Sequence, residues 1–169
     1  KNASMHVELA KNSLGATDTL LNIASSNRAI AAINGNYFDA YTPGVTSRTI
    51  YNGLVMDGHE VKVFDSKLPV FYYTKDGAVG ILPGIDFLKK YYEGSIQEAL
   101  QIGPTLMRNG QIWLNPKDEG FTEEKILTLS AARSAVGVLP NRQVVFLTTR
   151  SATISQLAEI MKNLGATDA

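Results

Sequence analysis

The chain has 169 residues, 44% of them hydrophobic and 19% charged, and its 16 basic and 16 acidic side chains cancel to a formal net charge of zero. This length suits one domain with a core of its own, and the balanced charge argues against a nucleic-acid partner. No cysteine is present, which excludes disulfides and thiolate sites, and no stretch approaches the roughly 20 apolar residues of a membrane span.

The N-terminal third predicts short elements and one dense polar turn. We expect a short strand at residues 6–9, a helix around 19–24, a buried strand at 29–33 and a loop over 41–47. The Asn-Gly-Asn run at 34–36 ends the buried strand with residue types that accept left-handed backbone angles.

Amides, two aromatic rings and a carboxylate lie together in residues 32–39 (AINGNYFD). This grouping is typical of a strand end that presents binding groups. A plain turn is the alternative interpretation, because Asn-Gly is also the strongest short hairpin signal.

The middle of the chain predicts hairpins. Strands are expected at 48–56, 59–64, 70–74 and 78–82. Asp57-Gly58 and Asp76-Gly77 supply the turns between them. Helices are expected at 85–92 and 95–100, the second with Ser95 as its N-cap and Glu98 at the capping-box position.

The C-terminal part predicts further hairpins and the clearest helix. Strands are expected at 102–108, 111–114, 135–139 and 143–149, with a polar loop over 115–125. Residues 153–164 place their apolar side chains on one helical face, Ser151 or Thr153 can cap the start, and Gly165 can end the helix.

These elements predict an α+β fold, a mixed and mostly antiparallel sheet with hairpins and a C-terminal helix packed on it, in a single domain over residues 1–169. A helix, a glycine and a short loop normally lead into the next strand of an α/β unit. We therefore expect the domain to be truncated at its C-terminus.

Known catalytic and metal motifs are missing from the sequence. It has no serine-hydrolase elbow, P-loop or dinucleotide fingerprint. His6 and His59 lack a metal-ligand spacing, so we expect no histidine metal site and no cofactor, while scattered carboxylates and carbonyls leave calcium or another divalent cation open.

Several residues have the chemistry to bind an anion or a sugar. Arg133 lies among small residues at a strand start, where its planar fork suits a phosphate or, equally, a structural ion pair. Arg150 precedes the last helix, whose free N–H groups favour anions, so it can add a second positive charge there. The alternative interpretation is an arginine that is simply exposed to solvent at the end of a strand. Gly103 permits a close backbone or ligand approach, Pro104 marks a strand entry, and Asp39 is the best-placed carboxylate.

Four motifs, in this order, resemble the phosphodiester glycosidase family. They are residues 32–38 (AINGNYF), 103–106 (GPTL) with 109–110 (NG), 132–137 (ARSAVG), and 153–159 (TISQLAE) with 164–166 (LGA). The resemblance spans about residues 29–169. It implies a hydrolase that cleaves a sugar from a sugar-1-phosphodiester.

The resemblance also implies roles for individual residues. Arg133 would hold the phosphodiester, and Asp39 would activate water or trap the oxocarbenium-like centre. Substrate binding would fall to Asn34, Gly35, Asn36, Gly103, Pro104, Thr105 and Arg150. The chain departs from the family at Thr148-Thr149, where many bacterial relatives place Asp-Gly before the arginine. This interpretation requires Asn34 and Arg133 to face one cleft.

The family's setting predicts an extracytoplasmic protein, secreted or associated with the cell envelope, that acts on an exopolysaccharide or another carbohydrate or glycosyl phosphate. Two alternatives remain at this stage. The domain could bind carbohydrate without catalysis, or it could be a structural domain of a cell-envelope protein.

Overall fold

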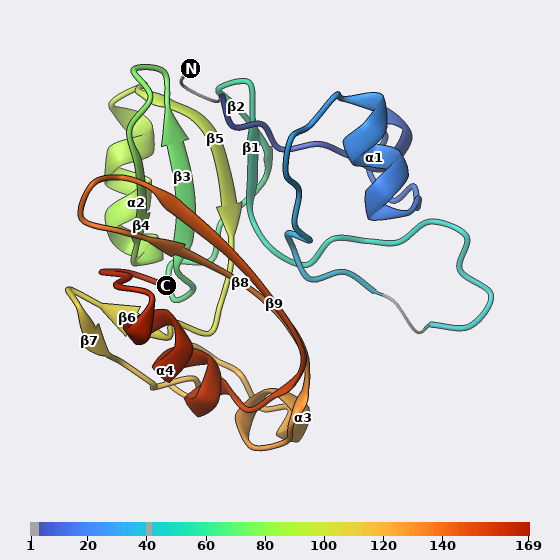
Figure 1. Cartoon of the computed structure of the whole chain (residues 1–169). Coiled ribbons are helices and arrows are strands. Elements are labelled where there is room, and N and C mark those ends of the chain that lie inside the picture. The colour runs from blue at the N-terminus through green and yellow to red at the C-terminus, as the bar shows by residue number, and fades with distance from the viewer. Residues whose placement is uncertain (1–3, 40–41) are drawn as a thin grey trace.

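The computed structural model describes residues 4–39 and 42–169 and has the predicted α+β architecture (Figure 1). A five-stranded sheet has the order β2-β1-β5-β3-β4, and all its strand pairs are antiparallel. Its strands are β1 (Leu54–Met56), β2 (His59–Lys62), β3 (Val70–Thr74), β4 (Val79–Leu82) and β5 (Ile96–Gln101).

The two predicted hairpins of this sheet are confirmed. Asp57 and Gly58 join β1 to β2 with φ angles of 50° and 79°, and Gly77 turns β3 into β4 with φ 86°. Left-handed angles of this kind match the twist of the flanking strands, which is why these dipeptides identify the turns.

Helix α2 (Gly84–Tyr92) covers one face of the sheet. Phe87 is fully buried there, with its ring 4.7 Å from that of Phe64 and 6.4 Å from that of Tyr72. Gly84, the first residue of this helix, lies directly against the backbone at Asp65. A side chain does not fit there, because a Cβ at this position would lie only 2.5 Å from the carbonyl oxygen of Asp65.

The central strand β5 corrects the sequence analysis, because residues 95–100 are not a helix. Glu98 is buried to 4% exposure in this strand, although its spacing from Ser95 matches a capping box. The segment has local helical propensity, but pairing on both sides with β1 and β3 supplies two ladders of hydrogen bonds. Tertiary pairing therefore overrides the local preference.

A second unit follows β5 along the chain. It contains β6 (Met107–Arg108), β7 (Gln111–Ile112), α3 (Glu124–Leu127), β8 (Ala131–Val138), β9 (Val144–Ala152) and α4 (Ile154–Asn163). The β8–β9 hairpin is longer than predicted and passes in front of the five-stranded sheet in Figure 1. Helix α4 forms a second core with Leu106 and Met107. The predicted cap is confirmed, since Thr153 and Gln156 make a capping box.

Residues 166–169 connect β6 to β8. The carbonyl of Ala169 accepts hydrogen bonds from the amides of Leu106 and Met107 at 2.8 and 3.2 Å. On the other side, Val138 donates to the carbonyl of Asp168 at 2.8 Å. Asp168 therefore pairs with strand β8.

The N-terminal region is held more loosely. It contains the 3-10 turn η1 (Ala10–Asn12) and helix α1 (Leu20–Ser26). Helix α1 was predicted from the sequence. It projects away from the sheet in Figure 1. No residue in 4–39 or 42–52 is buried.

The strands predicted at 6–9 and 29–33 do not form, and only the end of the predicted strand 48–56 joins the sheet, as β1. Ile30 is 92% exposed in an irregular segment. An extended segment becomes a strand only where a partner ladder is available, and neither 6–9 nor 29–33 pairs with a described strand. The predicted loop 41–47 includes Tyr41, which lies outside the described residues; 42–47 are irregular as expected.

The helices in the described ranges are all too short or too polar to cross a membrane.

Gln101, at the end of β5, is fully buried and hydrogen-bonds two separate backbone segments. Its Oε1 accepts from the amides of Gly53 and Asp65 at 3.0 and 2.9 Å. Its Nε2 donates to the carbonyls of Asp65 and, at 3.3 Å, Leu68. One side chain thus fixes the entry of β1 and the 65–68 connection at the exit of the central strand.

We predict that Gln101→Leu lowers the free energy of unfolding by about 2–4 kcal/mol, because it leaves four backbone groups without their partner where water has little access. Urea denaturation measures the effect. Gln111→Ala, at an exposed position of β7, is the control and should stay within about 0.5 kcal/mol of the wild type. Equal stability of the two variants would show that Gln101 has no special structural role.

Candidate functional site

Three of the predicted segments approach one another around Tyr37. Its hydroxyl donates a hydrogen bond of 2.9 Å to the carbonyl of Gly103, and its ring packs at 6.1 Å from that of Phe121. Arg133 lies near enough for its charge to act on the Tyr37 hydroxyl. We call Tyr37, Gly103, Phe121 and Arg133 the Tyr37 junction.

Gly103 fits this junction because it lacks a side chain. Its φ is +143°, which disfavours other residues, and a Cβ would lie 2.8 Å from the Phe121 ring. The sequence analysis expected a backbone segment or a ligand to approach Gly103. The group that approaches it in the structure is instead an aromatic side chain of the protein itself.

The turn at 34–36 lies beside β1 and β5, but it does not use the left-handed angles that its sequence suggests. None of the three residues has a positive φ. Gly35 is needed instead for proximity, since a Cβ there would lie 3.1 Å from the side chain of Leu100. Asn34 is exposed.

Asn36 holds this turn on the sheet. Its Nδ2 donates to the carbonyls of Asn52 and Gly53 at 3.0 and 3.3 Å. Its Oδ1 is buried and has no hydrogen-bond partner among the described residues. A buried acceptor without a partner is costly, so this oxygen lowers the stability of the turn.

Thr105 and Glu119 form a buried polar pair behind Pro104. The backbone amide of Thr105 donates to the Glu119 carboxylate at 2.9 Å, and the Thr105 hydroxyl donates to the other carboxylate oxygen. The residues are 2% and 5% exposed. Thr105 thus orients a buried carboxylate that the sequence analysis placed in a plain loop.

Arg133 is anchored by backbone carbonyls rather than by a carboxylate. Its Nε donates to Ala152 at 3.1 Å, and its Nη2 donates to Lys125 and Leu129 at 2.6 and 2.8 Å. No acidic side chain of the described residues forms an ion pair with it. The positive charge of Arg133 is therefore fixed in place and not neutralised.

Asp39 lies two residues after Tyr37, and Arg150 lies near the end of β9. The Asp39 carboxylate accepts a hydrogen bond of 3.0 Å from the amide of Thr42, which closes its own loop. Arg150 is exposed on β9. At the helix N-terminus that follows it, the Thr153–Gln156 capping box satisfies two of the backbone amides.

A cavity of about 530 Å³ lies between α4, β7 and β9. Thr149 and Ser151, which flank Arg150, are part of its wall, but none of the nine predicted site residues lines it. The cleft shared by Asn34 and Arg133 therefore stays a prediction.

The sequence analysis missed Tyr37, Phe121 and Glu119. Tyr37 lies inside the AINGNYFD motif, so the sequence did contain a signal that could have identified it. Phe121 and Glu119 come from a polar stretch without periodicity, and only the fold brings them to Gly103 and Thr105.

Comparison with known proteins identifies one family. The sequence profile of the phosphodiester glycosidase family matches residues 27–169. No curated protein matches the chain.

Two solved structures share the fold. The catalytic domain of zebrafish N-acetylglucosamine-1-phosphodiester alpha-N-acetylglucosaminidase, auto-inhibited by its pro-peptide, is 22% identical with a TM-score of 0.60; the match covers 80% of this chain and 47% of the zebrafish chain. A hypothetical protein from Synechocystis is 14% identical with a TM-score of 0.61, and the match covers 88% of this chain and 46% of that one. The chain thus spans less than half the length of either.

Although the Tyr37 residue is 39% exposed, desolvation of its hydroxyl raises the pKa of that group, and the charge of Arg133 offsets part of that rise. Because the folded pKa lies above the unfolded value of about 10, the folded state keeps its proton longer and stability falls as pH rises above about 10. We predict that Tyr37→Phe makes this alkaline loss of stability smaller and costs about 1 kcal/mol at pH 7 through the lost bond to Gly103.

Urea denaturation between pH 7 and 11 measures both effects. Tyr92→Phe, at a position 83% exposed, is the control for removal of a hydroxyl at pH 7 and should leave stability there unchanged. An alkaline loss of stability in Tyr37→Phe as steep as in the wild type would contradict the assignment.

Proposed function

The chain belongs to the phosphodiester glycosidase family, and we propose that it supplies the phosphate-binding part of a hydrolase that releases a sugar from a glycosyl phosphodiester. The family match over residues 27–169 supports this proposal. The zebrafish structure, named for action on an N-acetylglucosamine-1-phosphodiester, suggests the first substrate to test.

The anchoring of Arg133 is the observation that carries the proposal. A guanidinium has five N–H donors. Three of them, on Nε and Nη2, are occupied by backbone carbonyls, which leaves the two on Nη1 for a ligand. An oriented cation without a carboxylate partner binds a phosphate oxygen without first breaking an ion pair.

The proposed reaction breaks the bond between the anomeric carbon and the phosphate oxygen. Water attacks the anomeric carbon, and the phosphomonoester departs with the bonding electron pair. Arg133 stabilises the charge that develops on the phosphate, so the leaving group needs little protonation. Asp39 is the proposed carboxylate that takes the proton from water.

Sugar recognition is assigned to the turn next to the junction. The exposed amide of Asn34 can bind sugar hydroxyls, and Asn36 can join it once a movement of the turn uncovers its buried Oδ1. Gly35, Gly103, Pro104 and Thr105 shape the backbone around them, and Arg150 adds positive charge. The proposed setting is an exported carbohydrate, such as an exopolysaccharide, handled outside the cytoplasm by a secreted or envelope-associated protein.

We predict that Arg133→Lys lowers kcat/KM by about 10²–10³-fold in the full-length protein, because lysine cannot hold three carbonyls and still offer two donors to phosphate. The assay follows release of the reducing sugar from N-acetylglucosamine-1-phosphodiesters and related glycosyl phosphodiesters. Circular dichroism checks that the variant is folded.

Arg142→Asn is the matched control. It removes a positive charge from the β8–β9 turn, and asparagine accepts the φ of 62° at this position. Its kcat/KM should stay within about twofold of the wild type. Full turnover in folded Arg133→Lys would remove Arg133 from the mechanism, and sugar binding by the wild type without any release would favour a carbohydrate-binding module.

A further inference from the structure

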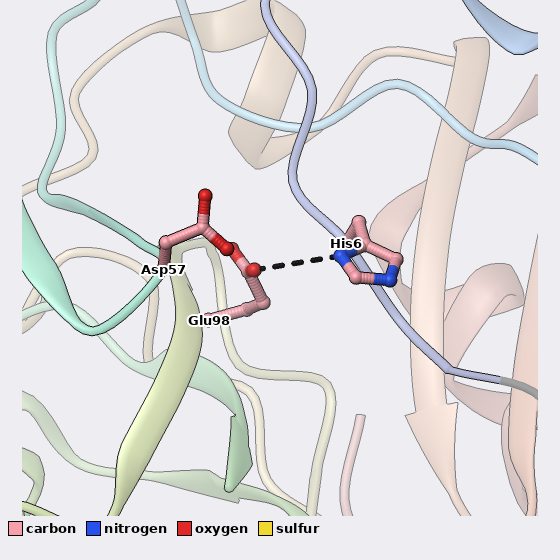
Figure 2. A group of neighbouring side chains, drawn as sticks. All are labelled: His6, Asp57 and Glu98. Atoms are coloured by element: carbon pink, nitrogen blue, oxygen red, sulfur yellow. Dashed lines mark ion pairs between the residues drawn. The ribbon is translucent and has the colours of Figure 1, made fainter. Parts of the chain in front are cut away.

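A cluster of metal-ligand side chains lies away from the Tyr37 junction. His6 comes from the N-terminal segment, Asp57 from the β1–β2 turn and Glu98 from the central strand β5 (Figure 2). One ligand atom from each residue lies within 4.8 Å of the other two. Three separate segments thus direct an imidazole and two carboxylates toward one point.

The spacing suits ligands of a shared cation better than direct pairing. His6 Nδ1 lies 3.7 Å from Glu98 Oε1, too far for a hydrogen bond. Two ligand atoms that each lie about 2.05 Å from a tetrahedral zinc ion are about 3.3 Å apart. His6 Nδ1 and Glu98 Oε1 therefore need to move only slightly closer together to bind the same ion.

Each of the three side chains is also held by a neighbour. The Nε2 of His6 is hydrogen-bonded to Ser4 Oγ at 3.1 Å, which leaves Nδ1 toward Glu98. Gln97 donates to the Asp57 carboxylate at 3.2 Å, and the amide of Val7 donates to Glu98 at 3.4 Å. Outer contacts of this kind orient ligands in protein metal sites.

Among the described residues, the imidazole of His6 is the one group able to carry a positive charge that lies within ion-pair distance of these carboxylates. Glu98 is only 4% exposed, and Asp57 places a second carboxylate beside it. Within residues 4–39 and 42–169, no lysine or arginine forms an ion pair with either one. Lys75, from the neighbouring β3–β4 turn, donates to the carbonyl of Gly94 instead. A buried carboxylate is costly without compensation, and a divalent cation would supply it.

We propose that His6, Asp57 and Glu98 bind a divalent transition-metal ion of the zinc type, which fastens the N-terminal segment to the five-stranded sheet. The imidazole ligand favours such an ion over calcium or magnesium, which prefer oxygen donors alone. His6, Asp57 and Glu98 lie far apart in the sequence and form no short motif. The sequence alone therefore did not indicate this site.

The test is calorimetric titration of the intact, chelator-stripped protein with zinc chloride. We expect one equivalent to bind. His6→Ala and Asp57→Asn should each weaken binding by at least about tenfold, and asparagine keeps the left-handed turn at position 57. His59→Ala removes the other histidine, an exposed residue of β2, and should leave the affinity within about twofold.

Thermal unfolding gives a second measurement. Zinc should raise the midpoint of the wild type and of His59→Ala, and at the same concentration it should raise that of His6→Ala clearly less. Absence of saturable binding, equal weakening by His6→Ala and His59→Ala, or calcium binding as tight as zinc binding would each overturn the proposal. The activity assay of Arg133 variants is independent of all these outcomes.

Discussion

The exit of the central strand depends on one buried amide. Gln101 satisfies backbone groups of Gly53, Asp65 and Leu68 at the point where β5 leaves the sheet. Two residues later the chain reaches Gly103, whose carbonyl receives the Tyr37 hydroxyl. The position of the Tyr37 junction is therefore set by hydrogen bonding inside the sheet, and the long N-terminal region is placed relative to that fixed point.

Arg133 shows how a protein can prepare a cation without neutralising it. Backbone carbonyls carry partial negative charge, so they orient a guanidinium while its full charge remains for an incoming anion. An aspartate in the same place would give a tighter local contact and a weaker anion site. The choice of partner thus separates a structural arginine from one suited to phosphate.

The sequence predicts elements whose cause is local. Asp57-Gly58 and Asn109-Gly110 adopt the left-handed angles that their residue types favour, and α4 follows from its apolar face and its Thr153 cap. Strand β5 was not predicted, because its identity depends on β1 and β3 on either side. For the candidate site, motifs located Arg133 and Gly103, but the contacts of Glu119 and Phe121 arise only from folding.

Residues 4–39 and 42–52 contain no buried side chain, while Phe87 and Met161 are fully enclosed in the two cores. Detaching the N-terminal region therefore exposes little apolar surface, and its free energy of opening is a small fraction of that for global unfolding. Native-state hydrogen exchange would resolve the chain into two cooperative units of unequal protection. The region that carries Asn34 and Asn36, the amides proposed to bind sugar, can thus rearrange around a ligand while the cores stay intact.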